Sequence, residues 1–235
     1  MKQIQNEKID TAGQITAVVS QVNAEKRKSA VAMDILNSDA AIEQVVFLLP
    51  QQTSGDLLRL DMMGDELSIN GSLAGAYVAL QRAGTQCGTF EISGLQEVVR
   101  AEIADSKISI TFPSLIVRRI DTANSIVVLA GISYFVQQAT LPVLQLTPEQ
   151  RSTITKLLEN NPAAGIVFYQ ANKIQPVVFV EETNSLVWEQ ACGSGSLAFS
   201  LLTGVSTVQQ PSGSYITITT SGDTLGVSVP VRKVD

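Results

Sequence analysis

Two segments of the chain repeat each other closely. Residues 66–74 read ELSINGSLA and residues 190–198 read QACGSGSLA, and each segment continues into small and apolar residues. A second pair, residues 9–12 and 120–123, is identical over the four letters IDTA. Self-similarity of this kind is the sequence signature of a duplicated structural unit. We therefore expect the chain to contain two copies of one fold.

Each copy is expected to combine helices with strands. The Ser-Asp pair at 38–39 favours a helix start, which predicts a helix over residues 40–49 that ends at a proline. The Thr-Pro-Glu run at 147–149 predicts a second helix over residues 150–159. Apolar runs bounded by turn residues predict strands over residues 57–62, 166–168 and 177–180, and a hairpin over residues 215–231.

The absence of histidine limits the chemistry that is open to the chain. None of the 235 residues is histidine, which excludes Ser-His-Asp and Cys-His catalysis and the common zinc sites. Two separated cysteines cannot form a thiolate cage, so we expect no metal.

The net charge of −6, with scattered basic residues, argues against a nucleic-acid partner. Because no apolar stretch is long enough to span a membrane and the first ten residues are polar, we expect a cytoplasmic protein.

The repeated segments each place a group that can exchange a proton before a turn rich in glycine and serine. That group is Ser68 in the first copy and Cys192 in the second. Where such a turn opens a helix, the free N–H groups and the helix dipole bind an anion such as a carboxylate. A thiol in this position is shifted toward the thiolate. We therefore expect Cys192 to be a base or nucleophile, although a buried structural role is the commoner fate of a lone cysteine. Cys87 lacks this setting and is expected to be structural.

Other ligand-binding motifs fit these turns poorly. Neither turn ends in the Gly-Lys-Ser/Thr of a P-loop. Neither carries the three spaced glycines and the following acidic residue of a dinucleotide-binding fingerprint. No lysine lies near either turn, which argues against a pyridoxal phosphate Schiff base. We therefore expect no cofactor.

The repeated turns resemble the signatures of the diaminopimelate epimerase superfamily, which includes proline racemase and the histidine racemases of opine metallophore synthesis. Residues 191–196, ACGSGS, are similar to its second catalytic signature, Ala-Cys-Gly-Ser/Thr-Gly. Residues 68–74 are similar to the first, Cys-Gly-Asn-Gly or Cys-Gly-Asn-Ala, with serine replacing the cysteine and isoleucine the glycine after it. Residues 8–19 resemble the N-terminal strand and loop of the family. Residues 59–62, RLDM, are most similar to the histidine racemase branch.

The resemblance implies an α+β fold with two pseudo-symmetric domains. Each is a curved, mostly antiparallel sheet wrapped around a central helix, and the active site lies in the cleft between them. We place the domains at residues 1–113 and 114–235, with the last strand able to pack on the first domain. The implied activity is a cofactor-independent racemase or epimerase that acts on a small-molecule amino acid. A homodimer is one assembly that such a chain could adopt.

The resemblance also implies the site residues. Ser68 and Cys192 form the catalytic pair, facing each other across the substrate, so that one removes the Cα proton and the other delivers a proton on the opposite face. The implied substrate-binding residues are Asn70, Gly71, Ser72, Gly193, Ser194 and Gly195 for the carboxylate, Glu181 or Glu182 for the ammonium group, and Gln14 and Asn124 as equivalent contacts from the two halves.

The serine at position 68 leaves three functions open. A hydroxyl is a far weaker base than a thiolate, so a racemase with this pair would favour one direction. A dehydratase or double-bond isomerase on the same scaffold would need only one base. A catalytically impaired homologue would still bind an amino acid. We expect the racemase or epimerase first, and exchange of the Cα hydrogen with D2O separates it from the binding protein.

Overall fold

The computed structural model describes residues 6–20, 27–50, 58–64 and 66–234. The first half contains β1 (Asn6–Thr11), β2 (Gln14–Val19), α1 (Lys28–Ser38), β3 (Gln44–Pro50), β4 (Leu58–Met62), α2 (Ile69–Ala83), β5 (Cys87–Ile92), β6 (Val99–Ala104) and β7 (Lys107–Pro113). The second half contains η1 (Ser114–Ile116), β8 (Val117–Asp121), β9 (Ile126–Leu129), β10 (Ile132–Gln138), α3 (Pro148–Leu157), η2 (Leu158–Asn160), β11 (Ala163–Gln170), β12 (Lys173–Val180), β13 (Ser185–Trp188), α4 (Gly193–Thr203), β14 (Thr207–Gln209), β15 (Tyr215–Ser221) and β16 (Thr224–Val234).

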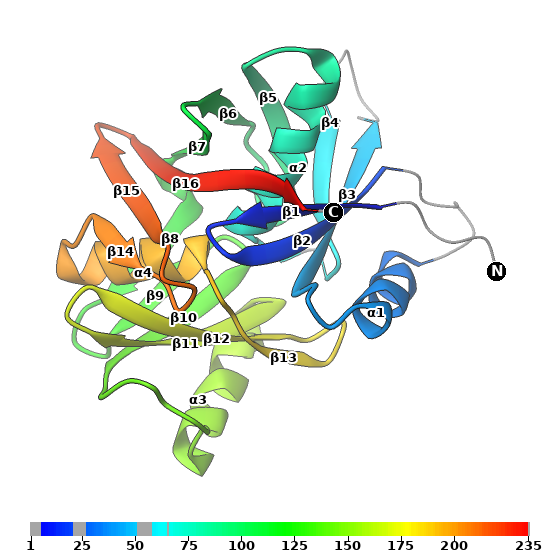
Figure 1. Ribbon diagram of the computed structural model, residues 1–235. Helices are drawn as coiled ribbons and strands as arrows, with labels where there is room; N and C mark the ends of the chain where they lie inside the picture. Colours follow the sequence, from blue (N-terminus) through cyan, green and yellow to red (C-terminus); the bar gives the residue numbers. More distant parts are fainter. Residues whose placement is uncertain (1–5, 21–26, 51–57, 65, 235) are drawn as a thin grey trace.

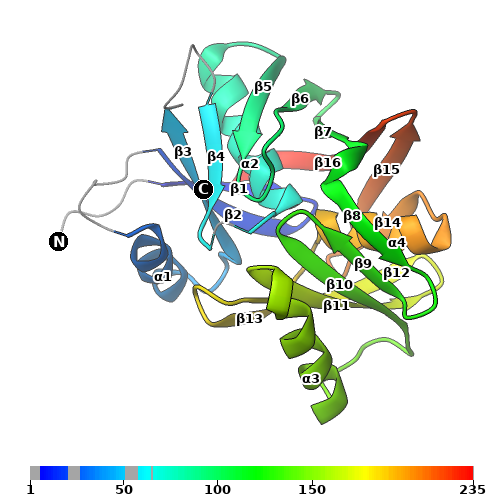
Figure 2. The same cartoon turned by 180° about the vertical axis from the view of Figure 1, so that it is seen from behind.

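The first group of strands closes into a barrel around α2. Strands β1 to β7 lie side by side in chain order, and β16 pairs with both β7 and β1. The helix inside contacts β1 to β7 and β16, and most of its residues, such as Leu73 and Ala74, are buried as a result. Figures 1 and 2 show α2 within this group and β16 crossing over it. The barrel thus fixes the position of the N-terminus of α2.

The second group repeats the same sequence of connections around α4. In the first half the β1–β2 hairpin leads through α1 to β3, which runs parallel to β2. In the second half the β9–β10 hairpin leads through α3 to β11, which runs parallel to β10. Each half then continues with an antiparallel strand, a buried helix and further strands, although β8 and β13 have no counterpart among the described residues of the first half. The expected α+β fold from a duplicated unit is confirmed.

The strand order corrects one of the two sequence matches. The first IDTA segment ends β1, whereas the second ends β8, which precedes the strand equivalent to β1. In this order the turn equivalent to residues 12–13 is residues 130–131, so Asn124 is not the counterpart of Gln14. The similarity has a local cause. Each segment contains an aspartate that accepts a turn N–H, from Gly13 at 2.6 Å in the first case and from Asn124 at 3.1 Å in the second.

The helix predicted over residues 40–49 was wrong. The helix α1 ends at Ser38, and the apolar run that follows is the buried strand β3. Val45, Val46 and Phe47 are fully buried between β2 and β4. A continuous apolar run is ambiguous between a buried helix and a buried strand, and its β-branched residues favour the strand.

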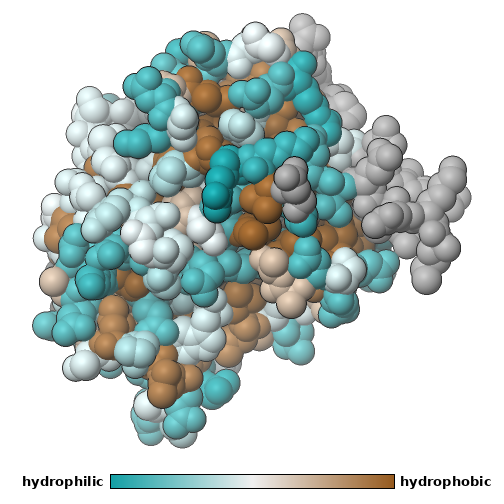
Figure 3. All heavy atoms as spheres, viewed as in Figure 1, coloured by the Kyte–Doolittle hydropathy of each residue, from teal (hydrophilic) through white to brown (hydrophobic). Residues whose placement is uncertain are grey.

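Other predicted elements are confirmed. The helix α3 begins after Thr147, whose side chain forms a capping box with Gln150. The predicted hairpin is β15 and β16, joined at residues 222–223. None of the described helices is long and apolar enough to cross a membrane. On the face shown in Figure 3, apolar residues lie in separate groups among polar ones.

Candidate active site

Ser68 is the residue that begins the central helix of the first half. Its Oγ accepts a hydrogen bond from the backbone N–H of Gly71 at 3.1 Å, and its carbonyl accepts one from the hydroxyl of Ser72 at 2.7 Å. A serine in this position satisfies one of the free N–H groups of the helix start. The Ser68 oxygen is therefore fixed at the positive end of the α2 dipole.

Cys192 occupies the equivalent position in the second half. Its Sγ accepts a hydrogen bond from the N–H of Gly195 at 3.2 Å, and its carbonyl accepts one from the hydroxyl of Ser196 at 2.6 Å. These contacts match those of Ser68 atom for atom. The expected equivalence of the two residues therefore extends from the sequence to the hydrogen bonds of the helix starts.

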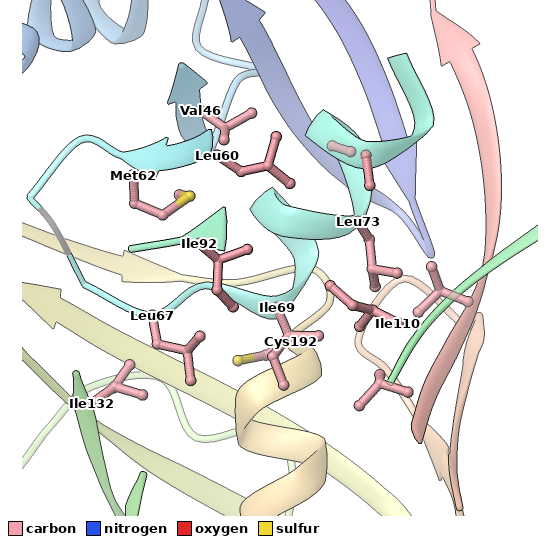
Figure 4. Close-up of a cluster of buried hydrophobic side chains, with 14 of the residues drawn as sticks. Val46, Leu60, Met62, Leu67, Ile69, Leu73, Ile92, Ile110, Ile132 and Cys192 are labelled. Carbon is pink, nitrogen blue, oxygen red and sulfur yellow. The ribbon is translucent and has the colours of Figure 1, made fainter. Parts of the chain in front are cut away.

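The two helix N-termini touch each other. The N–H of Gly193 donates to Oδ1 of Asn70 at 2.7 Å, and Nδ2 of Asn70 donates to the carbonyl of Thr11 at 3.1 Å. A Cβ atom at Gly193 would lie 2.8 Å from both Asn70 Oδ1 and Ile69 Cγ2, so only glycine permits this approach. Figure 4 shows Cys192 beside Ile69 and Leu67, the residues on either side of Ser68.

A small cavity lies where these helix starts meet. Its volume is about 30 Å³, which is room for about one or two water molecules. The polar residues that line it are Glu43, Gln44, Glu66, Ser68, Tyr134, Ser185, Glu189 and Ser194, and the apolar ones are Met63, Leu67, Ile132, Val178, Val180 and Val187. Cys192 is not in this lining, but its sulfur contacts Tyr134 and Ser194, which are. An amino acid would require the cavity to widen.

The structure places the predicted site residues in three groups. Ser68 and Ser194 line the cavity, and Gln14 joins it through hydrogen bonds to Gln44 and Glu189. Those in the first turns of α2 and α4 are buried around it: Asn70, Gly71, Ser72, Gly193 and Gly195. Three lie on exposed turns outside the lining: Asn124, bonded to Asp121 in the β8–β9 turn, and Glu181 and Glu182, between β12 and β13.

A chain of hydrogen bonds joins Ser68 to Glu189. The Ser68 hydroxyl lies 2.7 Å from Oε1 of Gln44. Nε2 of Gln44 donates to Oε1 of Gln14 at 2.7 Å and to the Thr16 hydroxyl oxygen at 2.9 Å. Nε2 of Gln14 then donates to Oε1 of Glu189 at 3.0 Å. Because the Gln44 amide already uses its nitrogen as the donor, its oxygen must accept, and the proton of Ser68 points toward Gln44.

Two carboxyl groups at the cavity, those of Glu189 and Glu43, have pKa values raised into the neutral range. Burial raises the pKa of Glu189 to about 7, against the opposing effect of hydrogen bonds from Cys192 and Gln14. Burial likewise raises the pKa of Glu43 to about 8, opposed by the N–H of Gln190, with the charge of Glu189 adding to the rise. Oε2 of Glu189 is buried and has no hydrogen-bond partner among the described residues. The site can therefore receive a cation or a hydrogen-bond donor.

Cys192 is surrounded by groups that change its acidity in both directions. Burial, and then the charge of Glu189, raise the pKa of the thiol well above its usual range, although hydrogen bonds from Tyr134 and Ser194 lower it. The expected shift toward the thiolate is therefore wrong for this arrangement, because burial outweighs the helix start. The hydroxyl of Tyr134 lies 3.4 Å from the sulfur and 2.7 Å from the oxygen of Ser194. A cation placed beside Glu189 would remove the main unfavourable charge and favour the thiolate.

Sequence reasoning missed Glu43, Gln44, Tyr134 and Glu189. Glu189 stands three residues before Cys192 and could have been found from that spacing. The other three lie on β3 or β10 or directly before β3, far from either repeated turn in the sequence. Pairing of β2 with β3 and of β10 with β11 brings them to the cavity.

Comparison with known families identifies the chain. Residues 3–234 match a family model described as the histidine racemase CntK N-terminal domain. The chain belongs to this family. It is accordingly an amino-acid racemase or isomerase, and the resemblance to the diaminopimelate epimerase superfamily is confirmed. None of the curated proteins compared with the sequence matches it.

Solved structures share the fold of this histidine racemase family member. A predicted epimerase from Pseudomonas aeruginosa has a TM-score of 0.66 at 12% identity, with 99% of this chain and 98% of that chain covered. A phenazine biosynthesis protein PhzF family structure from Enterococcus faecalis has a TM-score of 0.62 at 13% identity, covering 98% and 96%. A probable proline racemase from Agrobacterium radiobacter K84 has a TM-score of 0.56 at 11% identity, covering 99% and 91%.

Proposed function

We propose that this protein inverts Cα of a free amino acid without a cofactor, using Cys192 and Ser68 on opposite faces of the substrate. The observation that carries the proposal is the pair of matched helix starts, each with its side-chain acceptor bonded to the third N–H of the turn. In one direction the Cys192 thiolate takes the Cα proton and becomes a thiol. The Ser68 hydroxyl gives its proton to the other face and becomes an alkoxide. Solvent then reprotonates Ser68 and takes the proton from the Cys192 thiol, which restores both groups.

The substrate carboxylate would bind near the two helix N-termini. Their partial positive charge stabilises the negative charge that develops on the carboxylate when the Cα proton leaves. In the structure the N–H of Gly193 is bonded to Asn70. Binding would therefore exchange this contact between the helices for contacts with the substrate.

The acidic lining favours a cationic amino acid. Glu43, Glu66 and Glu189 line the cavity, and an ammonium group supplies the donor that Oε2 of Glu189 lacks. A basic side chain such as imidazole would use a second carboxylate. Together with the family assignment, this makes histidine the first substrate to test. Its ammonium group beside Glu189 would also favour the Cys192 thiolate, so that the base forms when the substrate binds.

The experiment is Cα hydrogen exchange in D2O, followed by NMR or mass spectrometry. The panel contains both enantiomers of histidine, proline, glutamate and aspartate, together with hydroxyproline and diaminopimelate. We expect exchange and inversion with histidine, and loss of both in Cys192→Ala. No exchange with any amino acid would overturn the proposal.

A one-base reaction is the second candidate, and one contact favours it. The proton of Ser68 points to Gln44 rather than into the cavity, so Ser68 must turn before it can protonate a substrate. A dehydratase or double-bond isomerase would not need that turn. Formation of an unsaturated product from a hydroxyproline-type substrate, without inversion, would support it. Amino-acid binding by calorimetry without turnover would instead indicate a binding homologue.

A further inference from the structure

Tyr134 is a buried tyrosine whose hydroxyl points at the catalytic cysteine. It lies on β10 and is fully buried. Its oxygen is 3.4 Å from Sγ of Cys192 and 2.7 Å from Oγ of Ser194. A buried tyrosine hydroxyl normally has a hydrogen-bond partner, and both partners here belong to the start of α4. The ring thus joins a strand of the sheet to the sulfur.

Burial disfavours a charged sulfur, and the hydroxyl groups around it oppose that effect. The N–H of Gly195 donates to Sγ at 3.2 Å, and the hydroxyls of Tyr134 and Ser194 lie 3.4 and 3.6 Å away. The α4 dipole adds a partial positive charge at the same point. The 2.7 Å contact between the two hydroxyl oxygens uses one of the two hydroxyl protons, so when Ser194 donates to Tyr134, the hydroxyl of Tyr134 can donate to the sulfur. Hydrogen bonds to a charged acceptor are stronger than those to a neutral one, so this donor favours the thiolate over the thiol.

The sheet is shaped to hold this ring. Tyr134 is paired in register with Gly165 of β11. A Cβ atom at Gly165 would lie 2.8 Å from Cε1 of the Tyr134 ring, so glycine leaves the space that the ring fills. In the first half, Thr16 of β2 is paired in register with Gln44 of β3 and accepts from its side chain. Tyr134 thus directs its hydroxyl at Cys192 in the second half, whereas Thr16, at the equivalent position of the first half, bonds to Gln44.

We propose that Tyr134 is a positioning residue that donates its hydroxyl hydrogen bond to Cys192 and stabilises the thiolate, with Ser194 holding the hydroxyl in place. The proposal rests on the proposed function for its catalytic meaning. The titratable groups that face this cluster are Glu189, directly before α4, and Glu43 and Glu66 across the cavity. Glu189 carries a negative charge when ionised and raises the pKa of the thiol, so it acts against Tyr134.

The test measures the ionisation of Cys192 directly. In a Cys87→Ser background, NMR of labelled cysteine follows the thiol through a pH titration. Tyr134→Phe keeps the ring and removes the hydroxyl, and we expect the pKa of Cys192 to rise by about one to two units. The pH dependence of kcat for Cα exchange should move in the same direction, with KM little changed. Tyr169→Phe is the matched control, because Tyr169 packs on Phe199 of α4 and does not touch the sulfur.

The outcomes separate this proposal from the proposed function. An unchanged or lowered pKa of Cys192 in Tyr134→Phe would overturn the role of Tyr134, whether or not the protein is a racemase. A raised pKa in a protein that exchanges no amino acid would support Tyr134 and overturn the racemase. Ser194→Ala provides a second reading if Tyr134→Phe folds poorly. It should shift the pKa in the same direction by a smaller amount.

Discussion

Ser68 and Cys192 hold the same place in the two halves but differ in acidity. Each side chain accepts a hydrogen bond from the backbone N–H three residues later in its own helix. A thiol ionises near pH 8.5 in the absence of perturbation, whereas a serine hydroxyl is a far weaker acid. The proton of Ser68 is also engaged by Gln44. The pair is therefore symmetric in position and asymmetric in chemistry.

Restoring the thiol at position 68 should make the two directions more equal. In Ser68→Cys, we expect the slower of the two initial rates, measured from L- and D-histidine, to rise about tenfold or more, because a thiol is the better acid and base. Cys192→Ala should lower both rates by about 100- to 10,000-fold. Chiral chromatography measures the rates, and Cys87→Ser, at an exposed site, serves as the control. A loss of activity in Ser68→Cys would contradict this account.

The raised pKa of Glu189 also predicts how stability depends on pH. Its carboxyl titrates at about 7 in the folded protein, so between about pH 4.5 and 7 the folded state binds more protons than the unfolded state. The free energy of unfolding should then fall as pH rises through this window. Glu189→Gln should be more stable than the parent at pH 8, and the difference should disappear below about pH 4.5. Urea unfolding measures the free energy of unfolding of the two proteins at each pH. An equal difference at the two pH values would contradict the raised pKa of Glu189.

Among the elements of the fold, the starts of α2 and α4 could be predicted from the sequence, whereas the residues that surround them at the cavity could not. A Gly/Ser turn after a proton-exchanging residue is a local signal. The cavity lining instead depends on contacts such as Gln14 to Glu189, which are 175 residues apart in the sequence. Glu181 and Glu182 were expected to contact the substrate because of their place in the sequence relative to the family. Both instead lie on an exposed turn outside the cavity lining. Local turn chemistry around Asp10 and Asp121 likewise produced a match between strands that are not equivalent.

The contact between the two helices makes a prediction at this scale. In Gly193→Ala the new methyl group would meet Asn70 and Ile69, and we expect a loss of about 1–3 kcal/mol in the free energy of unfolding. Gly75→Ala, also in a central helix, is the comparison, because its methyl group would meet mainly the flexible end of Leu60 at 3.1 Å. Its loss should be smaller. Equal effects in denaturant unfolding would indicate that the helix contact is loose.

At the scale of the whole molecule, β16 joins the two halves into one structure. It pairs with β15 of the second half and with β7 and β1 of the first. A fragment of residues 1–113 leaves both edges of the first barrel open. We expect it to show no cooperative unfolding by calorimetry, whereas the same fragment linked to residues 224–235 should show it. Cooperative unfolding of the shorter fragment would mean that the first half is independent of β16.

The proposed function requires that Cys192 exchanges the Cα proton of a cationic amino acid. The most direct measurement is deuterium incorporation at Cα of L- and D-histidine in D2O, by the parent protein and by Cys192→Ala. We predict incorporation with inversion in the parent and incorporation at least about 100-fold slower in Cys192→Ala. Equal incorporation by the two proteins would contradict the claim.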